Sequence, residues 1–365
     1  MDPSAAVISA RGLTRRFDGK LAVDGLSLDV AHGTILGVIG PSGSGKTTTI
    51  RMLTGSLART AGECLVLGDD PMHFRRRTRA EIAYMPQQFS LYEDLTAREN
   101  VGFVAALYGI GPFRRGGLIR RALQVVDLWE ERNKLARELS GGMQRRLELA
   151  CALVHSPSVL FIDEPTAGID PLLRQSIWGE LRRLRSEGRT LLVTTQYVSD
   201  AEYCDRVALI SDGQLVALDE PGTLRRMVFG GEVLDLATAR AVDPEMLASV
   251  PGLMNVRQPE ARRLIIVTQD AAVATPRIIE TLRRQGVEVG KLEEYQPSFD
   301  EVFASLVEQR RATEADSARP VTDLTTSADP RADALADAAR SAELDRSGGR
   351  ARTRAGSDAV RGPEP

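Results

Sequence analysis

The sequence predicts an α/β protein with a mainly parallel sheet that is covered on both faces, followed by a smaller α+β domain. Three observations carry this prediction. Short apolar runs alternate with amphipathic helical stretches up to about residue 228. The pattern from about residue 88 to 152 is mostly helical, which indicates a helical subdomain inserted into the sheet domain. A second alternation of strand and helix patterns runs from residue 229 to about 311.

The first domain, residues 1–228, has three apolar runs that are typical of buried parallel strands: 34–40, 158–163 and 190–195. In the helical subdomain, residues 117–131 place Leu118, Leu123, Val126 and Leu128 on roughly one face. We expect a helix there that packs against its neighbours.

The second domain, residues 229–311, shows strand and helix patterns in alternation. We expect strands at 232–238, 262–268 and 287–295, and helices at 244–250, 275–286 and 298–309. The remaining residues, 312–365, are dominated by Ala, Asp, Arg and Ser and contain no aromatic residue. Such a segment buries too little apolar surface to offset its ordering entropy, so we predict a disordered tail.

Composition limits the classes of function. The chain has 365 residues, 42% hydrophobic and 27% charged, with a net charge of -3, so nucleic acid is not an expected partner. Cys64, Cys151 and Cys204 are odd in number and form no CxxC pair, which favours a reducing compartment and a cytoplasmic location. No apolar run approaches the roughly 18 residues of a membrane span, so we expect any membrane role to come through a partner.

The stretch "GPSGSGKTT" has the composition and context of a phosphate-binding loop. It follows the apolar strand "ILGVI" and opens the helical run at 47–55. Glycines let backbone N–H groups fold around an anion, and the helix N-terminus adds positive potential. We expect Lys46 to reach the outer phosphates and the Thr47 hydroxyl to suit Mg²⁺. The candidate residues are Gly40, Pro41, Ser42, Gly43, Ser44, Gly45, Lys46, Thr47 and Thr48.

The apolar strand at 158–163 ends in one acidic residue, Asp163, and a second, Glu164, follows it. Asp163 is placed to hold Mg²⁺ through water, and Glu164 is placed to polarise an attacking water. Adjacent acids at a strand end are usually only solvated, but behind a phosphate loop they indicate nucleotide hydrolysis. The sequence therefore predicts a bound phosphate chain with Mg²⁺.

The stretch "ELSGGMQRR" resembles the signature motif of the ATP-binding subunits of ABC transporters. Here the signature is Leu139, Ser140, Gly141, Gly142 and Met143, with methionine where the family usually has glutamine. The resemblance covers roughly residues 7–228 and implies a P-loop NTPase core of the ABC ATPase type. It also implies that Ser140, Gly141 and Gly142 cap the ATP held by a partner domain, as a helix N-terminus could do.

Other stretches match the family in order. Phe17 resembles the aromatic residue that stacks on adenine, although a core position is the alternative. Gln87 resembles the glutamine that contacts Mg²⁺ and links the site to the helical subdomain, with Gln88 as the competing choice. The stretch "AGIDP" resembles the loop in which an aspartate, here Asp170, faces the other subunit.

The resemblance implies how such a chain works with partners. In this family two nucleotide domains pair head to tail, so we expect a dimer with a second copy or with a paralogous ATPase.

The ending "YQPSFDEVFASLVEQ" resembles ABC-2-type exporter ATPases, including the daunorubicin-resistance group. We therefore expect an ATP hydrolase on the inner face of the cell membrane that drives a separate permease and exports a drug, lipid or polysaccharide-like substrate. An importer ATPase with a regulatory C-terminal domain, or an ABC ATPase outside transport, are the alternatives.

The strand at 190–195 delivers Gln196, where most members of the family carry a histidine that contacts the γ-phosphate. A glutamine keeps an N–H donor but cannot become cationic. Two hypotheses follow. Either Gln196 serves as the phosphate contact while Glu164 polarises the water, or the site binds ATP, hydrolyses it poorly and works as a nucleotide-gated clamp.

Overall fold

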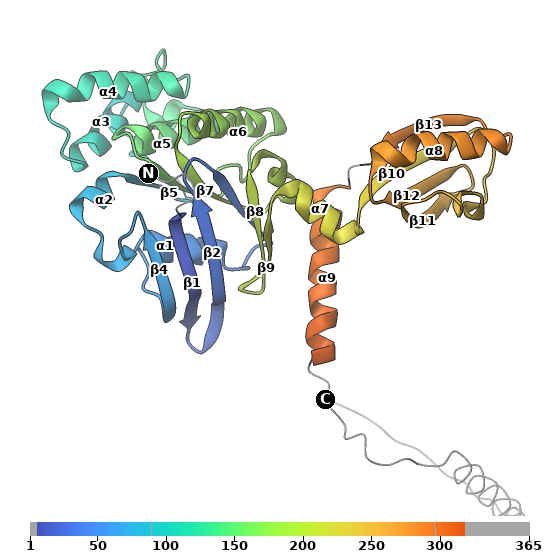
Figure 1. Ribbon diagram of the computed structural model, residues 1–365. Helices are drawn as coiled ribbons and strands as arrows, with labels where there is room; N and C mark the ends of the chain where they lie inside the picture. The colour runs from blue at the N-terminus through green and yellow to red at the C-terminus, as the bar shows by residue number, and fades with distance from the viewer. Residues whose placement is uncertain (1–5, 89, 296, 318–365) are drawn as a thin grey trace, which may run out of the picture. The chain divides into compact units, whose positions relative to one another are not determined.

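The computed structural model describes residues 6–88, 90–295 and 297–317. One compact unit ends at Thr313 and contains three β-sheets with their covering helices (Figure 1). The last helix, α9 (Phe299–Ser317), continues a short way into the segment predicted to be a disordered tail. The rest of that segment, residues 318–365, lies outside the described residues.

The largest sheet has six strands in the order β5-β6-β7-β3-β8-β9. Neighbouring strands are parallel except for β8 and β9, which are antiparallel. The strands are β3 (Ile35–Ile39), β5 (Ile82–Met85), β6 (Val159–Asp163), β7 (Thr190–Thr195), β8 (Arg206–Ser211) and β9 (Gln214–Asp219). The three apolar runs expected to be parallel strands are thus the neighbours β6, β7 and β3.

Both faces of this sheet are buried, which explains why its strands are apolar throughout. In β6, Leu160 and Ile162 belong to one hydrophobic cluster, whereas Val159 and Phe161 belong to a second cluster on the other face. Side chains alternate across a strand, so a strand that is covered on both faces needs apolar residues at every position.

A three-stranded antiparallel sheet, in the order β2-β1-β4, was not predicted. Its strands are β1 (Ala6–Phe17), β2 (Lys20–Ala31) and β4 (Ala61–Val66). The pairing of β1 with β2 shifts register at several places, including between Ala10 and Leu13. Each shift interrupts the alternation of apolar and polar residues that predicts a strand from sequence.

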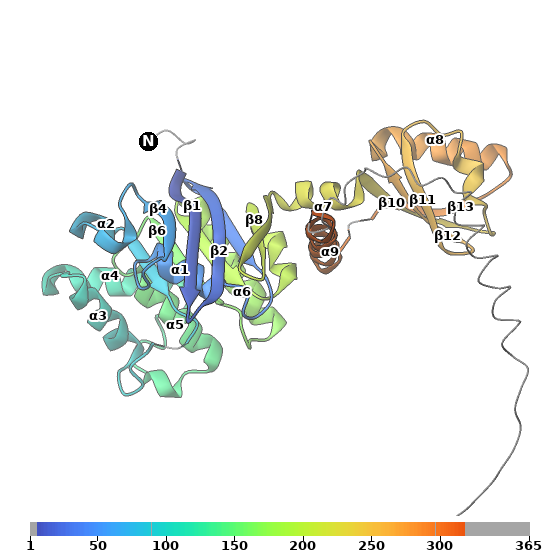
Figure 2. The same cartoon turned by 90° about the horizontal axis from the view of Figure 1, so that it is seen from below.

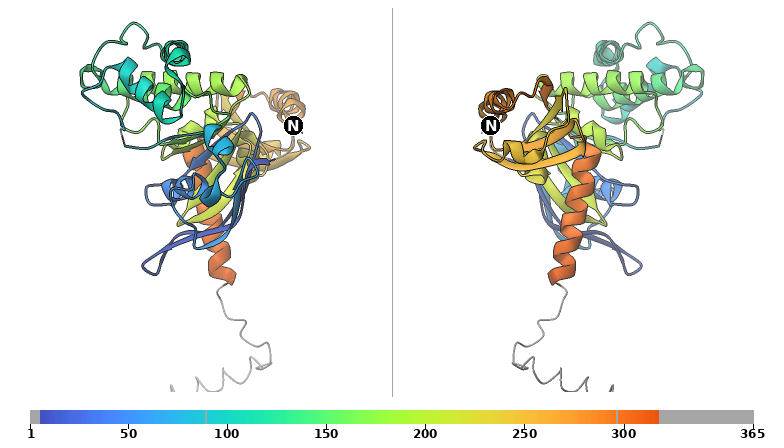
Figure 3. Two further views of the ribbon diagram at one scale, coloured as in Figure 1. Left: turned by 90° about the vertical axis from the view of Figure 1, so that its left-hand side faces the viewer. Right: turned by 90° about the vertical axis from the view of Figure 1, so that its right-hand side faces the viewer.

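The predicted helical subdomain contains α3 (Ala97–Leu107), α4 (Pro112–Val125) and α5 (Gly141–Leu153). The teal helices α3 and α4 lie together on one side of the six-stranded sheet (Figures 1 and 3). The expected helix at 117–131 ends earlier, because Val126 leaves the helical conformation and Asp127 has a φ of 55°. In the described ranges, no helix is both long and apolar enough to cross a membrane.

The other elements of this part surround the large sheet. They are the helices α1 (Lys46–Leu53), α2 (Arg76–Ala80), α6 (Pro171–Ser186) and α7 (Pro221–Phe229), with the 3-10 helices η1 (Pro71–His73), η2 (Ala136–Glu138) and η3 (Val198–Tyr203). Helix α1 begins directly after the loop that follows β3, and η3 begins just after β7. Both connections therefore leave the sheet at the same end of the parallel strands.

A four-stranded antiparallel sheet, in the order β11-β12-β10-β13, follows α7. Its elements are β10 (Glu232–Thr238), η4 (Pro244–Leu247), β11 (Leu253–Glu260), β12 (Arg263–Thr268), α8 (Ala271–Arg284) and β13 (Val289–Glu294). Helix α8 lies along one face of the sheet (Figure 2) and buries Ala274, Ile278 and Leu282 at helical spacing in a third cluster. Strand β11 was not predicted, because most of its residues are exposed and its polar residues do not alternate regularly with apolar ones.

Helix α9 packs against the first hydrophobic cluster of the six-stranded sheet rather than against the third cluster. Phe299, Val302 and Leu306 are the residues that join it. Their spacing of three and four residues places them on one helix face. The last predicted helix of the small domain therefore contributes to the core of the large one.

The burial of Phe161 predicts a specific loss of stability. This side chain of β6 is fully buried in the second cluster, whereas Phe113 on α4 is fully exposed. Phe161→Ala removes a core side chain and should lower the free energy of unfolding by about 3 to 5 kcal/mol. Urea unfolding checks this, and Phe113→Ala is the matched control that should leave the midpoint almost unchanged.

Candidate functional site

The loop between β3 and α1 needs glycine at two positions for steric reasons. A Cβ at Gly40 would lie 2.1 Å from the carbonyl oxygen of Ile210. Gly45 has a φ of 103°, and a Cβ there would lie 2.5 Å from the carbonyl oxygen of Ala22. Any larger residue at either position would push the loop away from its neighbours, so the glycines permit the tight turn that opens α1.

Lys46 is a buried cation held by the loop itself. Its Nζ donates to the carbonyl oxygens of Gly40 at 2.9 Å and Pro41 at 3.0 Å. It also lies 3.3 Å from Oε1 of Glu164, and the Lys46 side chain is 3% exposed. A buried charge needs partners, and here the carboxylate of Glu164 supplies the opposite charge beside the loop.

Asp163 ends β6 with one oxygen bound and one unpartnered. Its Oδ1 accepts from the Thr47 hydroxyl at 3.1 Å and from the Thr194 hydroxyl at 2.5 Å. Its Oδ2 is buried and has no hydrogen-bond partner among the described groups. An orphaned carboxylate oxygen next to a threonine hydroxyl fits Mg²⁺, which takes few protein oxygens and keeps waters and phosphate oxygens as its other ligands.

Glu164 is held in place by its backbone and by Gln87. It has a φ of 49°, in the left-handed region that few non-glycine residues adopt. Its N–H points at Thr194, whose hydroxyl accepts at 3.0 Å. The Gln87 amide donates from Nε2 to Oε2 of Glu164 at 2.8 Å. Of the two candidate glutamines, Gln87 is therefore the one that contacts the acidic pair.

Gln196 lies next to the phosphate loop. Its Oε1 accepts from the Ser42 hydroxyl at 3.0 Å, and the backbone N–H of Gly40 donates to the carbonyl of Thr195 at 3.4 Å. The end of β7 is thus joined to the loop by both a side chain and the backbone. With its oxygen on Ser42, the amide nitrogen of Gln196 remains a donor that a phosphate oxygen could accept from.

A cavity of about 220 Å³ lies where these side chains meet. Most of its wall is the phosphate loop, and Glu164 and Gln87 close another side. It is lined by Ala22, Ser42, Gly43, Gly45, Lys46, Thr47, Thr48, Gln87 and Glu164. Ser44 is buried, and its hydroxyl has no hydrogen-bond partner in the described part of the chain.

Phe17 lies at the end of β1, in the hairpin whose other strand contains Ala22 of the cavity wall. Its ring is 42% exposed, and the guanidinium carbon of Arg15 lies 4.4 Å from the ring centroid. A buried core position, the alternative weighed for this residue, therefore does not apply. The ring has a face available for stacking.

The signature residues lie at the start of α5. Ser140 caps this helix, and its hydroxyl accepts from the N–H of Met143 at 3.4 Å. Gly141 is exposed, and a Cβ at Gly142 would lie 2.1 Å from a methyl carbon of Leu173. Within the described ranges, no hydrogen bond or ion pair joins these residues to the phosphate loop. The structure therefore does not bring them into this chain's own cavity.

Asp170 is exposed at the start of α6. Its Oδ1 accepts from the backbone N–H groups of Leu172 at 3.1 Å and Leu173 at 3.0 Å. These bonds make it an ordinary N-cap, which stabilises the helix in the single chain. They leave its second oxygen, Oδ2, for other contacts.

Thr194 is a site residue that the sequence analysis did not select. Its hydroxyl donates to Asp163 and accepts from the N–H of Glu164, so it orients both acidic residues. The sequence signal that could have identified it is the pair Thr194 and Thr195, which follows the apolar residues 191–193 of the strand. The strand register then shows its role, because it places Thr194 directly beside Asp163.

Asp200 is a second such residue. It is fully buried in η3, four residues after Gln196. Its carboxylate accepts from the hydroxyls of Thr166 and Thr195, from the Trp178 indole and from Arg174. These bonds tie the loop after Glu164 to the end of β7 and to α6. An aspartate in a polar loop gives no sequence signal of such burial.

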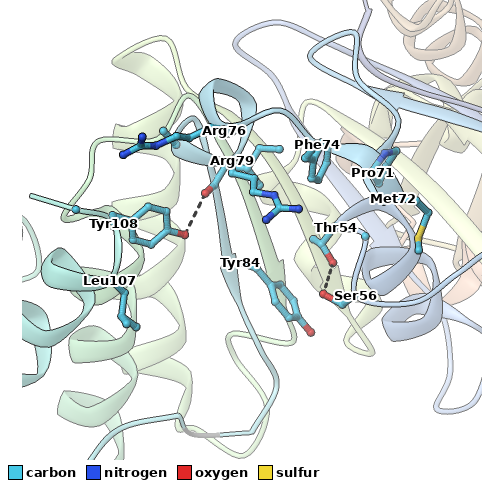
Figure 4. Close-up of a pocket in the computed structure, with 14 residues that line it drawn as sticks. Thr54, Ser56, Pro71, Met72, Phe74, Arg76, Arg79, Tyr84, Leu107 and Tyr108 are labelled. Atoms are coloured by element: carbon cyan, nitrogen blue, oxygen red, sulfur yellow. Dashed lines mark hydrogen bonds between the residues drawn. The ribbon is translucent and has the colours of Figure 1, made fainter.

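A larger cavity of about 630 Å³ opens between the end of α1, α2 and the end of α3 (Figure 4). We call it the α2 groove. Arg76 and Arg79 contribute positive charge, and Met72, Leu107 and Tyr108 contribute exposed apolar surface. The groove is lined by Thr54, Gly55, Ser56, Pro71, Met72, Phe74, Arg76, Arg79, Ala80, Ile82, Tyr84, Leu107, Tyr108 and Gly109. No carboxylate is among these residues.

Tyr84 and Tyr108 connect the α2 groove to the strand that leads to Gln87. Tyr108 stacks on His155 with ring centroids 3.6 Å apart, and its hydroxyl donates to the carbonyl of Ile82 at 3.4 Å. Burial, and after it the Asp163 carboxylate, raises the pKa of Tyr84, which lies three residues before Gln87. The groove thus borders the same strand that delivers Gln87 to the acidic pair.

Comparisons with known proteins agree with this geometry. The ABC transporter family matches residues 23–167. The chain is 35% identical, over 84% of its own length and 98% of the relative's, to the daunorubicin resistance ATP-binding protein DrrA3 of Streptomyces coeruleorubidus. It is 39% identical over 61% of its length to the probable multidrug ABC transporter ATP-binding protein YbhF of Escherichia coli, and the match spans only 39% of YbhF.

A solved structure shows the same fold. The dimeric, post-hydrolysis structure of the ATP-binding cassette MJ0796, bound to ADP and Pi, is 25% identical with a TM-score of 0.53. The match covers 58% of this chain and 98% of that cassette. The expected P-loop fold and the expected family are confirmed, and the chain belongs to the ATP-binding proteins of ABC transporters.

Proposed function

We propose that the chain hydrolyses ATP and that this hydrolysis powers a separate membrane permease. The observation that carries the proposal is the meeting of Lys46, Glu164 and Gln87 at one cavity of the phosphate loop. Lys46 supplies the charge that binds outer phosphates, and Glu164 is the residue placed to polarise water. The daunorubicin and multidrug names of the relatives support an exporter.

The proposal assigns the other site residues as follows. The backbone of 40–48 binds the phosphates, Phe17 stacks on adenine and Gln196 contacts the γ-phosphate. Thr47, Gln87 and Asp163, the last through water, would hold Mg²⁺. When bound, this ion neutralises charge on the phosphates.

We propose a dimer, because the signature residues and Asp170 lie away from the chain's own cavity and are available to a partner's ATP. The MJ0796 cassette, described as dimeric, supports this arrangement. The second subunit is another copy or a paralogous ATPase. The domain limits proposed are 1–228, 229–311 and a tail from 312. The third hydrophobic cluster supports a separate small domain, whereas α9 packs on the first cluster and continues as a helix to Ser317.

The permease docks in the α2 groove in this proposal, with the ATPase peripheral on the cytoplasmic face of the membrane. The groove combines arginines with apolar side chains, which fits an amphipathic segment that carries acidic residues. It borders β5, so an occupant could change the position of Gln87. The exported substrate would be a drug, lipid or polysaccharide-like molecule that the permease selects.

Substitution of Glu164 and Gln196 tests the proposed chemistry. Glu164→Gln removes the general base and should lower single-turnover hydrolysis by about 100-fold to 10,000-fold while ATP still binds. Gln196→Ala should slow turnover more than it weakens ATP binding, and Gln269→Ala on an exposed loop is the matched control. Wild-type protein that fails to turn over ATP would support the nucleotide-gated clamp, and an unaffected Glu164→Gln would reject Glu164 as the residue that polarises water.

Thr194 provides a test of how the acidic pair is positioned. Thr194→Val keeps the shape of the side chain but removes the hydroxyl that bonds both acidic residues. Asp163 then keeps only its bond to Thr47, and the N–H of Glu164 keeps only the backbone carbonyl of residue 194. The free energy of unfolding should fall by about 1 to 3 kcal/mol, and kcat should fall with it. Thr194→Ser keeps the hydroxyl and should resemble the wild type. Equal stability of the Val and Ser variants would contradict this account.

Charge reversal in the α2 groove tests the docking proposal. Purification from the protein's own host membranes in mild detergent should bring down a polytopic membrane protein in near-equal amount. Arg76→Glu with Arg79→Glu should abolish this association without changing basal ATP hydrolysis. Arg277→Glu with Arg283→Glu on exposed positions of α8 is the control for added negative charge. Recovery of ribosomes or nucleic acid without a permease would overturn the transport proposal.

A further inference from the structure

Helix α5 carries a buried ion pair that the proposed chemistry does not use. Arg145 and Glu148 lie three residues apart and are paired at 2.6 Å between Nη1 and Oε2. Their side chains are 4% and 2% exposed. Burial of two charges is costly unless their remaining polar atoms are also bound, so the other partners of this pair decide what it does.

The guanidinium of Arg145 binds the backbone of both segments that carry Gln87 and Glu164. Its Nη1 donates to the carbonyl of Pro86 at 3.2 Å, and its Nη2 donates to the carbonyl of Gln87. The same Nη2 lies 3.5 Å from the carbonyl of Glu164. One planar group therefore joins the segment that delivers Gln87 to the segment that delivers Glu164.

Glu148 holds the same segment further along the chain. Its Oε1 accepts from the backbone N–H of Ser90 at 2.8 Å, while Oε2 binds Arg145. Burial raises the pKa of the Glu148 carboxyl, and the Ser90 and Arg145 bonds oppose this rise. The backbone around Gln87 is thus held at three points, which are its own carbonyl, the carbonyl of Pro86 and the N–H of Ser90.

These contacts end at the side chains that meet in the cavity. With its backbone held by the pair, Gln87 donates to Oε2 of Glu164 at 2.8 Å. Arg145 therefore holds the backbone carbonyl of Glu164. It also holds the backbone of Gln87, whose amide binds the Glu164 carboxylate. Helix α5 also begins at the signature, with Ser140 as its N-cap.

We propose that Arg145 and Glu148 are positioning residues that hold Gln87 and Glu164 in the geometry required for hydrolysis. This inference rests on the proposed function, in which Glu164 polarises the attacking water. Arg145 supplies donors in a rigid fork that reaches several carbonyls at once, and Glu148 both neutralises it and fixes Ser90. Neither side chain needs to touch ATP.

Replacement of the pair by apolar residues separates positioning from stability. A buried ion pair that only stabilises the fold can often be replaced by apolar residues of similar volume without loss. We therefore expect Arg145→Met with Glu148→Leu to stay folded and to keep its Kd for a fluorescent ATP analogue. Its melting temperature should fall only because the carbonyls of Pro86 and Gln87 and the N–H of Ser90 lose their partners. Its kcat should fall by at least about tenfold, since small displacements of reacting groups have effects of this size.

Two further variants sharpen the test. Arg145→Lys keeps the charge but lacks the fork, so its kcat should fall nearly as far while nucleotide binding is unchanged. Glu180→Leu with Arg183→Met removes a pair of the same spacing on α6 and should leave kcat, Kd and melting temperature unchanged. If the apolar double variant does not fold, Arg145→Lys decides the question alone.

The outcomes distinguish this inference from the proposed function. Wild-type kcat in both Arg145→Lys and the apolar double variant, with turnover lost in Glu164→Gln, would overturn the positioning inference only. Full turnover in Glu164→Gln would overturn the proposed function of the site. A selective loss of kcat in Arg145→Lys, with the α6 control unaffected, would support the inference.

Discussion

Parallel pairing of β3, β7 and β6 is the constraint on which the site depends. The register places Val38 beside Thr194, and Thr194 beside Asp163. Because the strands are parallel, their carboxyl ends lie at the same edge of the sheet. The phosphate loop, Gln196 and the acidic pair therefore emerge as neighbours although they come from three distant parts of the chain.

This pairing also makes the site a place where charges are buried. Lys46, Asp163 and Glu164 all lie below the surface, where an unpaired charge would be costly. Each is bound by groups that the sheet brings alongside. Among the charged atoms of these three described side chains, only Oδ2 of Asp163 is buried without a hydrogen-bond partner. A triphosphate with its metal ion would bring the charges that match this arrangement, with Lys46 exchanging Glu164 and loop carbonyls for phosphate oxygens.

The fold was predictable where a single physical signal dominated. Strands β3, β6 and β7 are buried on both faces, so their apolar runs are unambiguous. Strand β1 has register shifts and β11 is mostly exposed, so neither has a clean alternation, and both were missed. The packing of α9 on the first cluster also depends on contacts far along the chain.

Local patterns in the sequence predicted the phosphate loop and the acidic pair, because tight turns require glycines and buried parallel strands require apolar residues before them. The residues that support this site became visible only in the packed fold. Thr194, Asp200 and Arg145 act mainly through hydrogen bonds to segments that lie 19 to 59 residues away in the chain. Such pairs carry no local pattern, since the distance between their atoms is set only when the sheet and α5 have packed.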